Sequence, residues 1–461
     1  MNAQATEGWV LQLSCLLTDI GRSELPEAAT KAAKNRLLHA FGVSLANSRL
    51  PAAEVAWKTM GGSSGPCFAF GRERRIDAGD AAFINGVIGH GSLLEDCGPG
   101  GLREGSHPGT FVIPAALAAA ESCAASGKTF IAGLVVGYEA VSRIGAAASS
   151  SVVQRRFRPV GIMAAFGAAA AAAMIFEAEA EQMAAALSIA ANLAGGSTQG
   201  IFEGTMEPYF QAGFGARNGL FAARLALAGA ATTRQALEGE FGFFQTYGGE
   251  PGKLDALLGP RPQLGIAVVG TKRFAVCLQN QQTLALIVDG LDAPLTADVI
   301  ERVVIRRPQF GTNGLNSPGV SRSAPFDNML SAQMSARFTA AAAILGKPVD
   351  DPVFFNSHHA DKDITELTRR IDLEPAADDS VAVELHLRNG RKVALDANKS
   401  GVLFPDDDVI RDSFLRRARS VQGGKASTTA ELIDELGTLN DVGRLTEAMA
   451  MVRAHEPSQL G

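Results

Sequence analysis

Apolar residues return every three to four positions along the first half of the chain, from Leu25 to about Leu258. This spacing is typical of α-helices that bury one face, and runs rich in β-branched residues are rare in the same stretch. The segment from Ala164 to Met174 consists almost entirely of small apolar residues, so it predicts a helix that is covered on all sides. We therefore expect the first half of the chain to be a helical region with closely packed helix axes.

The pattern changes after the turn at Gly259–Pro262. Val303–Ile305 is a short β-branched run, and Val381–Leu387 alternates apolar and polar side chains as a half-buried strand does. Asn389-Gly390 is a strong hairpin signal, and Lys392–Leu395 can return as the partner strand. Because helical patterns also occur in this part of the chain, the segment predicts a unit of mixed α+β structure.

These patterns predict a mainly α fold with a large all-helical domain and a smaller α+β domain. The helical domain is expected to comprise residues 1–264 and 403–461, and the α+β domain residues 265–402. Helical patterns resume after Phe404, so we expect the C-terminal tail to pack back on the first helical region.

Composition and charge narrow the possible functions. The chain has 461 residues, with 42 Lys and Arg against 48 Asp and Glu, and its formal net charge is −6. The chain lacks the excess of positive charge that is typical of proteins that bind nucleic acids or membrane surfaces, so we expect neither nucleic acid nor a membrane as a partner. The five cysteines contain no CxxC pair, which indicates a reducing compartment. No secretory signal is readable at the N-terminus, and we therefore predict a cytoplasmic protein.

Ionisable residues gather in a glycine-rich stretch between Asn85 and Glu121, whereas phosphate-binding, dinucleotide-binding, zinc-protease and serine-hydrolase motifs are absent from the sequence. They are His90, Glu95, Asp96, Arg103, Glu104 and His107. Loops held between rigid helices commonly carry acid/base sites. The alternative is a solvated polar loop whose histidines cap helices. His358-His359 has no second cluster of metal-ligand residues to support it, so no metal is expected there.

A series of short motifs resembles the MmgE/PrpD family, and the motifs occur in the family's order. They are Ala81–Gly86 followed by His90, Glu95-Asp96, His107-Pro108, Val112–Glu121, Gly133–Glu139, Arg156–Pro159, Leu237–Phe243, Lys272–Phe274 and Ala332–Phe338. The family includes 2-methylcitrate dehydratase, cis-aconitate decarboxylase and iminodisuccinate epimerase, which handle small polycarboxylates without a metal or organic cofactor. The resemblance also implies a helical domain, a smaller α+β domain, a cleft between them and a homodimer.

The resemblance implies roles for individual residues. His107 matches the family's His-Pro histidine, a candidate general acid or base because imidazole titrates near neutral pH. Asp96 matches the second carboxylate of an acidic pair, and Glu95 stands where the first is usually Asp. Lys272 matches a lysine that would hold a substrate carboxylate and stabilise enolate-like charge, although it could also be a solvent-facing lysine. The predicted catalytic residues are His107, Asp96 and Lys272, and the predicted substrate-binding residues are His90, Glu95, Arg103, Arg158 and Arg273.

The sequence also departs from the family pattern. His90 opens His-Gly-Ser-Leu where the family usually has His-x-x-Asp, and Arg158 replaces the histidine of a Phe-His-Pro motif. Members often carry a Lys and a His just before the glycine that matches Gly213, but Glu207–Ala212 contains neither. We therefore expect a related substrate with fewer carboxylates than 2-methylcitrate or cis-aconitate.

Together these features predict a lyase that needs no cofactor and moves a proton at a carbon α to a carboxylate. Dehydration is the first expectation, which would make the protein a carbon-oxygen lyase (hydro-lyase). Epimerisation is the second, with Glu207 or Tyr209 as the acid on the opposite face, and decarboxylation is the third. The alternative to an enzyme is a non-catalytic protein that binds a small acid or interacts with a partner.

Overall fold

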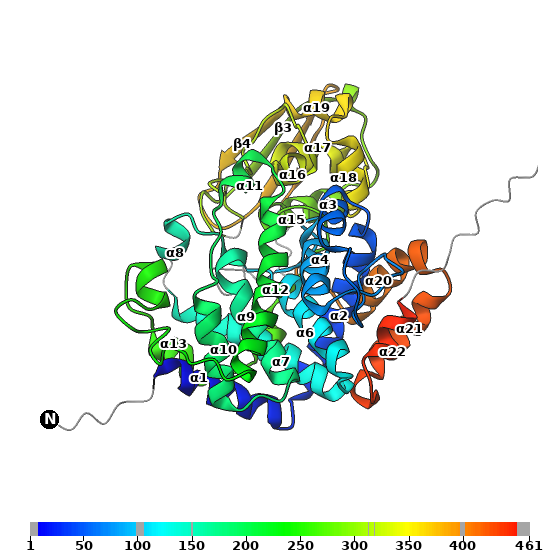
Figure 1. The fold of residues 1–461 in the computed structure, drawn as a ribbon. Coiled ribbons are helices and arrows are strands. Elements are labelled where there is room, and N and C mark those ends of the chain that lie inside the picture. The colour runs from blue at the N-terminus through cyan, green and yellow to red at the C-terminus, as the bar shows by residue number, and fades with distance from the viewer. Residues whose placement is uncertain are drawn as a thin grey trace, which may run out of the picture.

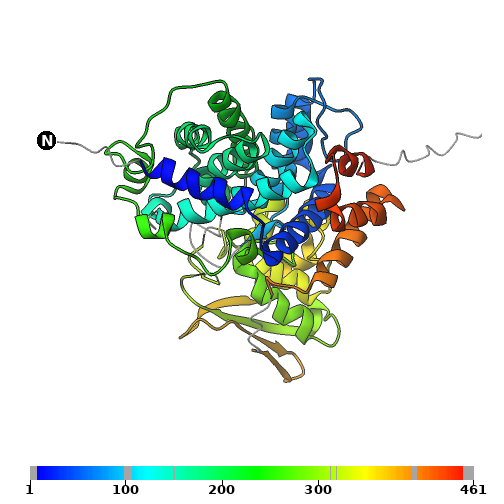
Figure 2. The ribbon, with the colours of Figure 1, turned by 90° about the horizontal axis from the view of Figure 1, so that it is seen from below.

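The computed structural model describes residues 8–97, 106–148, 151–311, 313–317, 319–396 and 402–449. In this part of the chain the fold is mainly helical, as the sequence pattern predicts, with two small sheets. A large body of helices lies below the four-stranded sheet and its helices in Figure 1. Figure 2, seen from below, shows the strands at one edge of the helical body.

Helices make up nearly all regular structure in the first half of the chain. They are α1 (Trp9–Arg22), α2 (Glu27–Asn47), α3 (Pro51–Met60), α4 (Ala78–His90), α6 (Gly109–Cys123), α7 (Gly127–Ala147), α8 (Ser151–Gln154), α9 (Pro159–Ile175), α10 (Ala180–Ala191), α11 (Gln199–Glu203), α12 (Glu207–Leu227), α13 (Leu254–Leu258) and α14 (Gly265–Val268). Helix α7 is long and apolar enough to cross a membrane, but 94% of its most apolar window is buried inside the protein. It is therefore a core helix of the helical body.

Helix α9 is the centre of this body, because every residue from Val160 to Ile175 is buried. It packs against α6, α7 and α12. Two glycines of α12 allow the close approach: a Cβ on Gly215 would lie 2.0 Å from the Ala164 Cβ, and a Cβ on Gly219 would lie 2.4 Å from the Ala168 Cβ. The all-round burial that the Ala-rich segment predicted is confirmed.

We expect Gly215→Ala to lower the free energy of unfolding by about 1–3 kcal/mol, because the new methyl group forces α9 and α12 apart. Denaturant unfolding measures the change. Gly62→Ala is the matched control, since a Cβ at Gly62 meets no atom within 4 Å. Equal stability of the two variants would contradict the close helix contact.

The second part of the chain carries the larger sheet, whose strand order is β4-β3-β5-β6. Its strands are β3 (Ile300–Arg307), β4 (Ile371–Pro375), β5 (Ala382–Leu387) and β6 (Lys392–Leu395), and its helices are α15 (Gln281–Gly290), α16 (Met329–Met334), α17 (Ala336–Ile344), α18 (Pro352–His358) and α19 (Lys362–Thr368). β5 and β6 pair antiparallel, and Gly390 between them has φ +82°. The predicted hairpin is therefore confirmed.

The C-terminal tail forms α20 (Asp407–Gln422), α21 (Lys425–Asp434) and α22 (Gly443–Ala448). Helix α20 packs against α2, so the tail returns to the helical body. The division of the chain into domains at residues 264 and 402 stays a prediction.

Candidate active site

A two-stranded sheet joins the loop after α4 to a segment far along the chain. β1 (Asp96–Cys97) pairs antiparallel with β2 (Gly270–Thr271), and Asp96 lies opposite Thr271. Continuing this register by one residue places Glu95 opposite Lys272. The Lys272 Nζ donates to Glu95 Oε1 at 2.7 Å and to the Leu93 carbonyl at 3.1 Å. The register thus creates an ion pair that is buried at both ends.

His107 lies next to this ion pair, just before α6. Its Nδ1 is 2.9 Å from the Asp96 carbonyl oxygen and 3.4 Å from Glu95 Oε1. Because a carbonyl oxygen only accepts hydrogen bonds, we infer that Nδ1 carries the proton and that Nε2 holds the lone pair. No hydrogen bond between described residues uses Nε2. His107 therefore presents an unprotonated nitrogen, as a general base does.

The crossing of α4 and α12 brings two more side chains to the site. A Cβ on Gly86 of α4 would lie 2.8 Å from the Gly213 Cα of α12, so the two helices touch at these glycines. His90 is one turn after Gly86, and Tyr209 is one turn before Gly213. Their rings meet edge to face, with centroids 6.1 Å apart, and the His90 and His107 rings are 5.5 Å apart. Both His90 and Tyr209 are buried.

Arg158, immediately before α9, completes this group. Its Nη2 contacts His90 Nε2, and its Nη1 donates to the Pro208 carbonyl at 2.7 Å and to Gln211 Oε1 at 3.2 Å. A guanidinium only donates, so His90 Nε2 is an acceptor and its Nδ1–H faces Glu95 Oε1 at 3.6 Å. We call the side chains that meet here the buried cluster, and its members are His90, Glu95, His107, Arg158, Tyr209 and Lys272.

Electrostatics set the protonation states in the buried cluster. Burial raises the pKa of Glu95, but the Lys272 ammonium, and after it the charges of His107 and His90 when these are protonated, outweigh burial and hold the pKa of Glu95 well below its ordinary value. Burial, and then the Lys272 charge, lower the pKa of His107 well below its ordinary value. Burial also lowers the pKa of His90 to about 4 and that of Arg158 to about 10. At neutral pH Glu95 is thus a carboxylate, Arg158 is a cation, and His90 and His107 are neutral.

Asp96, predicted as a catalytic residue, has a different position. Its carboxylate accepts the Gly109 N–H at 3.0 Å and 3.1 Å and the Tyr138 hydroxyl at 2.6 Å, at the N-terminus of α6. Burial raises the pKa of Asp96 to about 6, although the Tyr138 hydrogen bond opposes this rise. Only its backbone carbonyl contacts His107. The Asp96 carboxylate is thus held by Gly109 and Tyr138, and its catalytic role stays a prediction.

The structure does not bring Arg273 to the site. Its guanidinium pairs with Asp289, at 2.8 Å and 2.9 Å, and its side chain is 41% exposed. Lys272, the residue before it, is by contrast only 3% exposed. Glu207, one of the two candidate second acids, is exposed at the start of α12. Arg103 lies outside the described residues.

One residue near the site was not predicted from the sequence. The Gln333 Nε2 donates to the Ser92 carbonyl at 2.8 Å and to the Ala275 carbonyl at 2.7 Å. It therefore ties the loop after α4 to the segment after Lys272. Gln333 belongs to the Ala332–Phe338 motif, which was the available signal.

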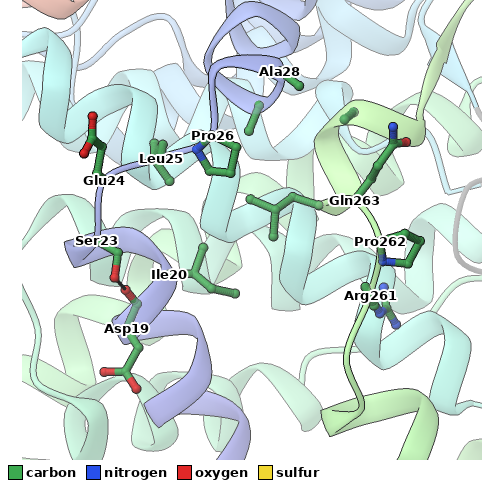
Figure 3. Close-up of a pocket in the computed structure, with 13 residues that line it drawn as sticks. Asp19, Ile20, Ser23, Glu24, Leu25, Pro26, Ala28, Arg261, Pro262 and Gln263 are labelled. Carbon is green, nitrogen blue, oxygen red and sulfur yellow. Dashed lines mark hydrogen bonds between the residues drawn. The ribbon is translucent and has the colours of Figure 1, made fainter.

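No group of three or more His, Cys, Asp and Glu residues in the described part of the chain could hold a metal ion. A hollow of about 410 Å³ lies elsewhere, between the turn that joins α1 to α2 and the segment from Arg261 to Ala267 (Figure 3). Arg261 donates to Ser142 Oγ at 2.6 Å and to the Ala256 carbonyl at 2.8 Å, so it holds its own segment in place. None of the predicted site residues lines this hollow.

Comparison with known families decides the assignment. The profile of the MmgE/PrpD N-terminal domain matches residues 12–253, more than half of the chain. The chain belongs to the MmgE/PrpD family. The matched region contains every member of the buried cluster except Lys272.

Several curated members of the MmgE/PrpD family are similar to this chain. It is 30% identical over 240 residues to the cis-aconitate decarboxylase-like protein oryM of Aspergillus oryzae, a match that covers 50% of this chain and 49% of that protein. It is 28% identical over 306 residues to cis-aconitate decarboxylase of Homo sapiens, covering 64% and 61%. It is 26% identical over 251 residues to cis-aconitate decarboxylase of Aspergillus terreus, covering 53% and 50%. The chain thus matches about half to three fifths of the length of these relatives.

Two departures from the MmgE/PrpD pattern meet in space. Arg158 stands in the motif where members commonly have histidine, and its Nη1 binds Pro208 and Gln211. These two residues lie in the segment that lacks the usual Lys and His. The two departures that the resemblance implies therefore lie in contact with each other.

Proposed function

We propose that the protein is a lyase that acts on a small carboxylate by proton transfer at the carbon α to a carboxylate group. One observation carries the proposal: His107 Nδ1 is fixed by the Asp96 carbonyl beside Lys272 and Glu95, which leaves Nε2 as a base. A neutral imidazole next to cations can remove a carbon-bound proton while the cations stabilise the enolate that forms. The family resemblance adds the expectation that no cofactor takes part.

Lys272 and Arg158 are the proposed carboxylate-binding groups. Counting Glu95 against these two cations leaves one net positive charge among the members of the buried cluster. Such a site suits an acid with fewer carboxylates than a triacid, in line with the altered segment from Glu207 to Ala212. Arg158 binds as a fixed cation and does not serve as a base, since a guanidinium stays protonated.

Dehydration is the reaction that this geometry supports best. His107 is neutral at neutral pH, so it can take a proton first but has none at Nε2 to give. Loss of the α proton followed by loss of a β-hydroxyl group needs this order. Decarboxylation is the second candidate, because the relatives described above carry the name cis-aconitate decarboxylase. A homodimer and a cytoplasmic location stay predictions.

Proton NMR in deuterated water tests the proposal with malate-like and citrate-like hydroxy acids and with cis-aconitate. Dehydration consumes a hydroxy acid and gives a new vinyl signal. Decarboxylation gives a deuterated product one carbon shorter, and epimerisation labels the substrate without net loss. Neither turnover nor deuterium uptake with any of the acids, from a folded protein, would overturn the proposal and favour a non-catalytic role.

The pH profile of kcat/KM should stay level as the pH falls through 6.5, the ordinary pKa of imidazole. The reason is that burial and Lys272 lower the pKa of His107, so the base keeps its lone pair in mild acid. Activity should decline only at a pH well below this value. Since kcat/KM reports the free enzyme, a half-point at 6.5 or above would show that His107 is not the base with the depressed pKa.

A further inference from the structure

The hydroxyl group of Tyr209 differs from those of the other two tyrosines in the chain. Tyr138 donates its hydroxyl to Asp96 at 2.6 Å, and Tyr247 donates to the Ala194 carbonyl at 2.7 Å. The Tyr209 hydroxyl is buried, and no described residue forms a hydrogen bond with it. Tyr209 itself is only 3% exposed. A buried phenol normally finds a partner, because leaving it unpaired costs free energy.

The position of Tyr209 indicates what that partner is. Its ring contacts His90, which also contacts His107. The charges of both Glu95 and Arg158 act on the pKa of its hydroxyl. Another unpartnered buried atom, Glu95 Oε2, belongs to the same cluster. Two unsatisfied polar atoms therefore belong to the same cluster as the proposed base, where a polar substrate would complete their hydrogen bonds.

We propose that Tyr209 is the general acid that protonates the departing hydroxyl group during dehydration, an inference that rests on the proposed function. His107 Nε2 takes the α proton, and the electron pair of that C–H bond forms the new C=C bond. The β C–O bond breaks, and the Tyr209 O–H proton joins the departing oxygen, so water leaves. The imidazolium and phenolate that result return to their neutral forms when a proton passes from one to the other through solvent.

Glu95 and Arg158 have opposite effects on the pKa of Tyr209. Burial raises the pKa of Tyr209, and the Glu95 charge adds to the rise, so the phenol holds its proton until the leaving group needs it. The Arg158 charge opposes the rise and stabilises the phenolate that forms. A neutral base and a neutral acid in one cluster form the pair that a dehydration requires.

Tyr209→Phe tests the inference, with Tyr247→Phe as the matched control. We expect Tyr209→Phe to slow the loss of water by about 10²-fold or more, and to leave proton exchange at the α carbon in deuterated water intact. An analogue with chloride in place of the leaving hydroxyl should react at the wild-type rate, because chloride departs without a proton. The unfolding midpoint of Tyr209→Phe should be no lower than that of the wild type, since the removed hydroxyl has no protein partner. Tyr247→Phe should match the wild type on both substrates.

Each other outcome has a definite meaning. A wild-type protein that neither exchanges nor converts any acid would overturn the proposed function itself. An active wild type whose Tyr209→Phe variant still loses water at the wild-type rate would overturn only the role of Tyr209. Equal loss with the hydroxyl and chloride substrates would also overturn it, because Tyr209 would then act in binding. A wild type that releases carbon dioxide and no water would leave no hydroxyl for Tyr209 to protonate, and would overturn it as well.

Discussion

Replacing His107 by Asn is expected to lower kcat by about 10²- to 10⁴-fold while the protein stays folded. His107 has φ +58°, in the left-handed region that Asn tolerates better than Ala. The Asn amide can also donate to the Asp96 carbonyl as the His107 Nδ1–H does. His107→Asn therefore removes Nε2 and little else. Steady-state kinetics on the acid identified by NMR measure the effect, and thermal unfolding checks the fold.

His386→Asn is the control for this variant. His386 lies on β5, where its Nε2 is 2.6 Å from Glu384 at the partly exposed face of the sheet. Its replacement should leave kcat and KM unchanged. If His107→Asn retains activity within a few-fold of the control, His107 is not the proton-transfer group, and the base must be sought among the other members of the buried cluster.

Short-range sequence patterns were enough to predict the β5–β6 hairpin. The alternation of Val383, Leu385 and Leu387 and the Asn389-Gly390 turn specify a hairpin with one buried face, because strand period and turn type act over a few residues. In contrast, β4 (Ile371–Pro375) was not predicted, and it pairs parallel with β3. Its five residues include Asp and Glu, and a parallel partner is chosen by tertiary packing that short-range spacing does not encode.

The site was predictable only as far as the family motifs reached. They placed His107 and Lys272, but the contact between Lys272 and Glu95 follows from the register of two two-residue strands. Arg273 pairs instead with Asp289, a contact that the family motifs do not encode. Tyr209 was one of two candidate second acids in the sequence, and the crossing of α4 and α12 places its ring against His90.

Lys272→Met should lower the free energy of unfolding by about 3–5 kcal/mol at neutral pH. The variant keeps the length and apolar stem of the side chain but leaves the Glu95 carboxylate buried without its cation. Adding Glu95→Gln should restore much of the loss, because it removes the uncompensated charge. The neighbouring Arg273→Met is the control: it breaks a partly exposed ion pair with Asp289, which is worth about 0–1 kcal/mol. Equal losses in the two single variants would contradict the buried ion pair.

The stability difference between the wild type and Lys272→Met should depend on pH. In the wild type the depressed pKa of Glu95 contributes stability above the unfolded-state value of about 4.3, and this contribution is lost as the pH falls through the folded-state pKa. Without Lys272, burial raises the pKa of Glu95 in the folded state. Above about pH 4.3 the buried charge therefore lowers the free energy of unfolding of the variant, and protonation of Glu95 in acid removes this loss. The stability gap between the two proteins should therefore be widest at neutral pH and narrow on acidification. A gap that stays constant from neutral to acid pH would mean that packing around the lysine stem, and not the charge of Glu95, accounts for the loss.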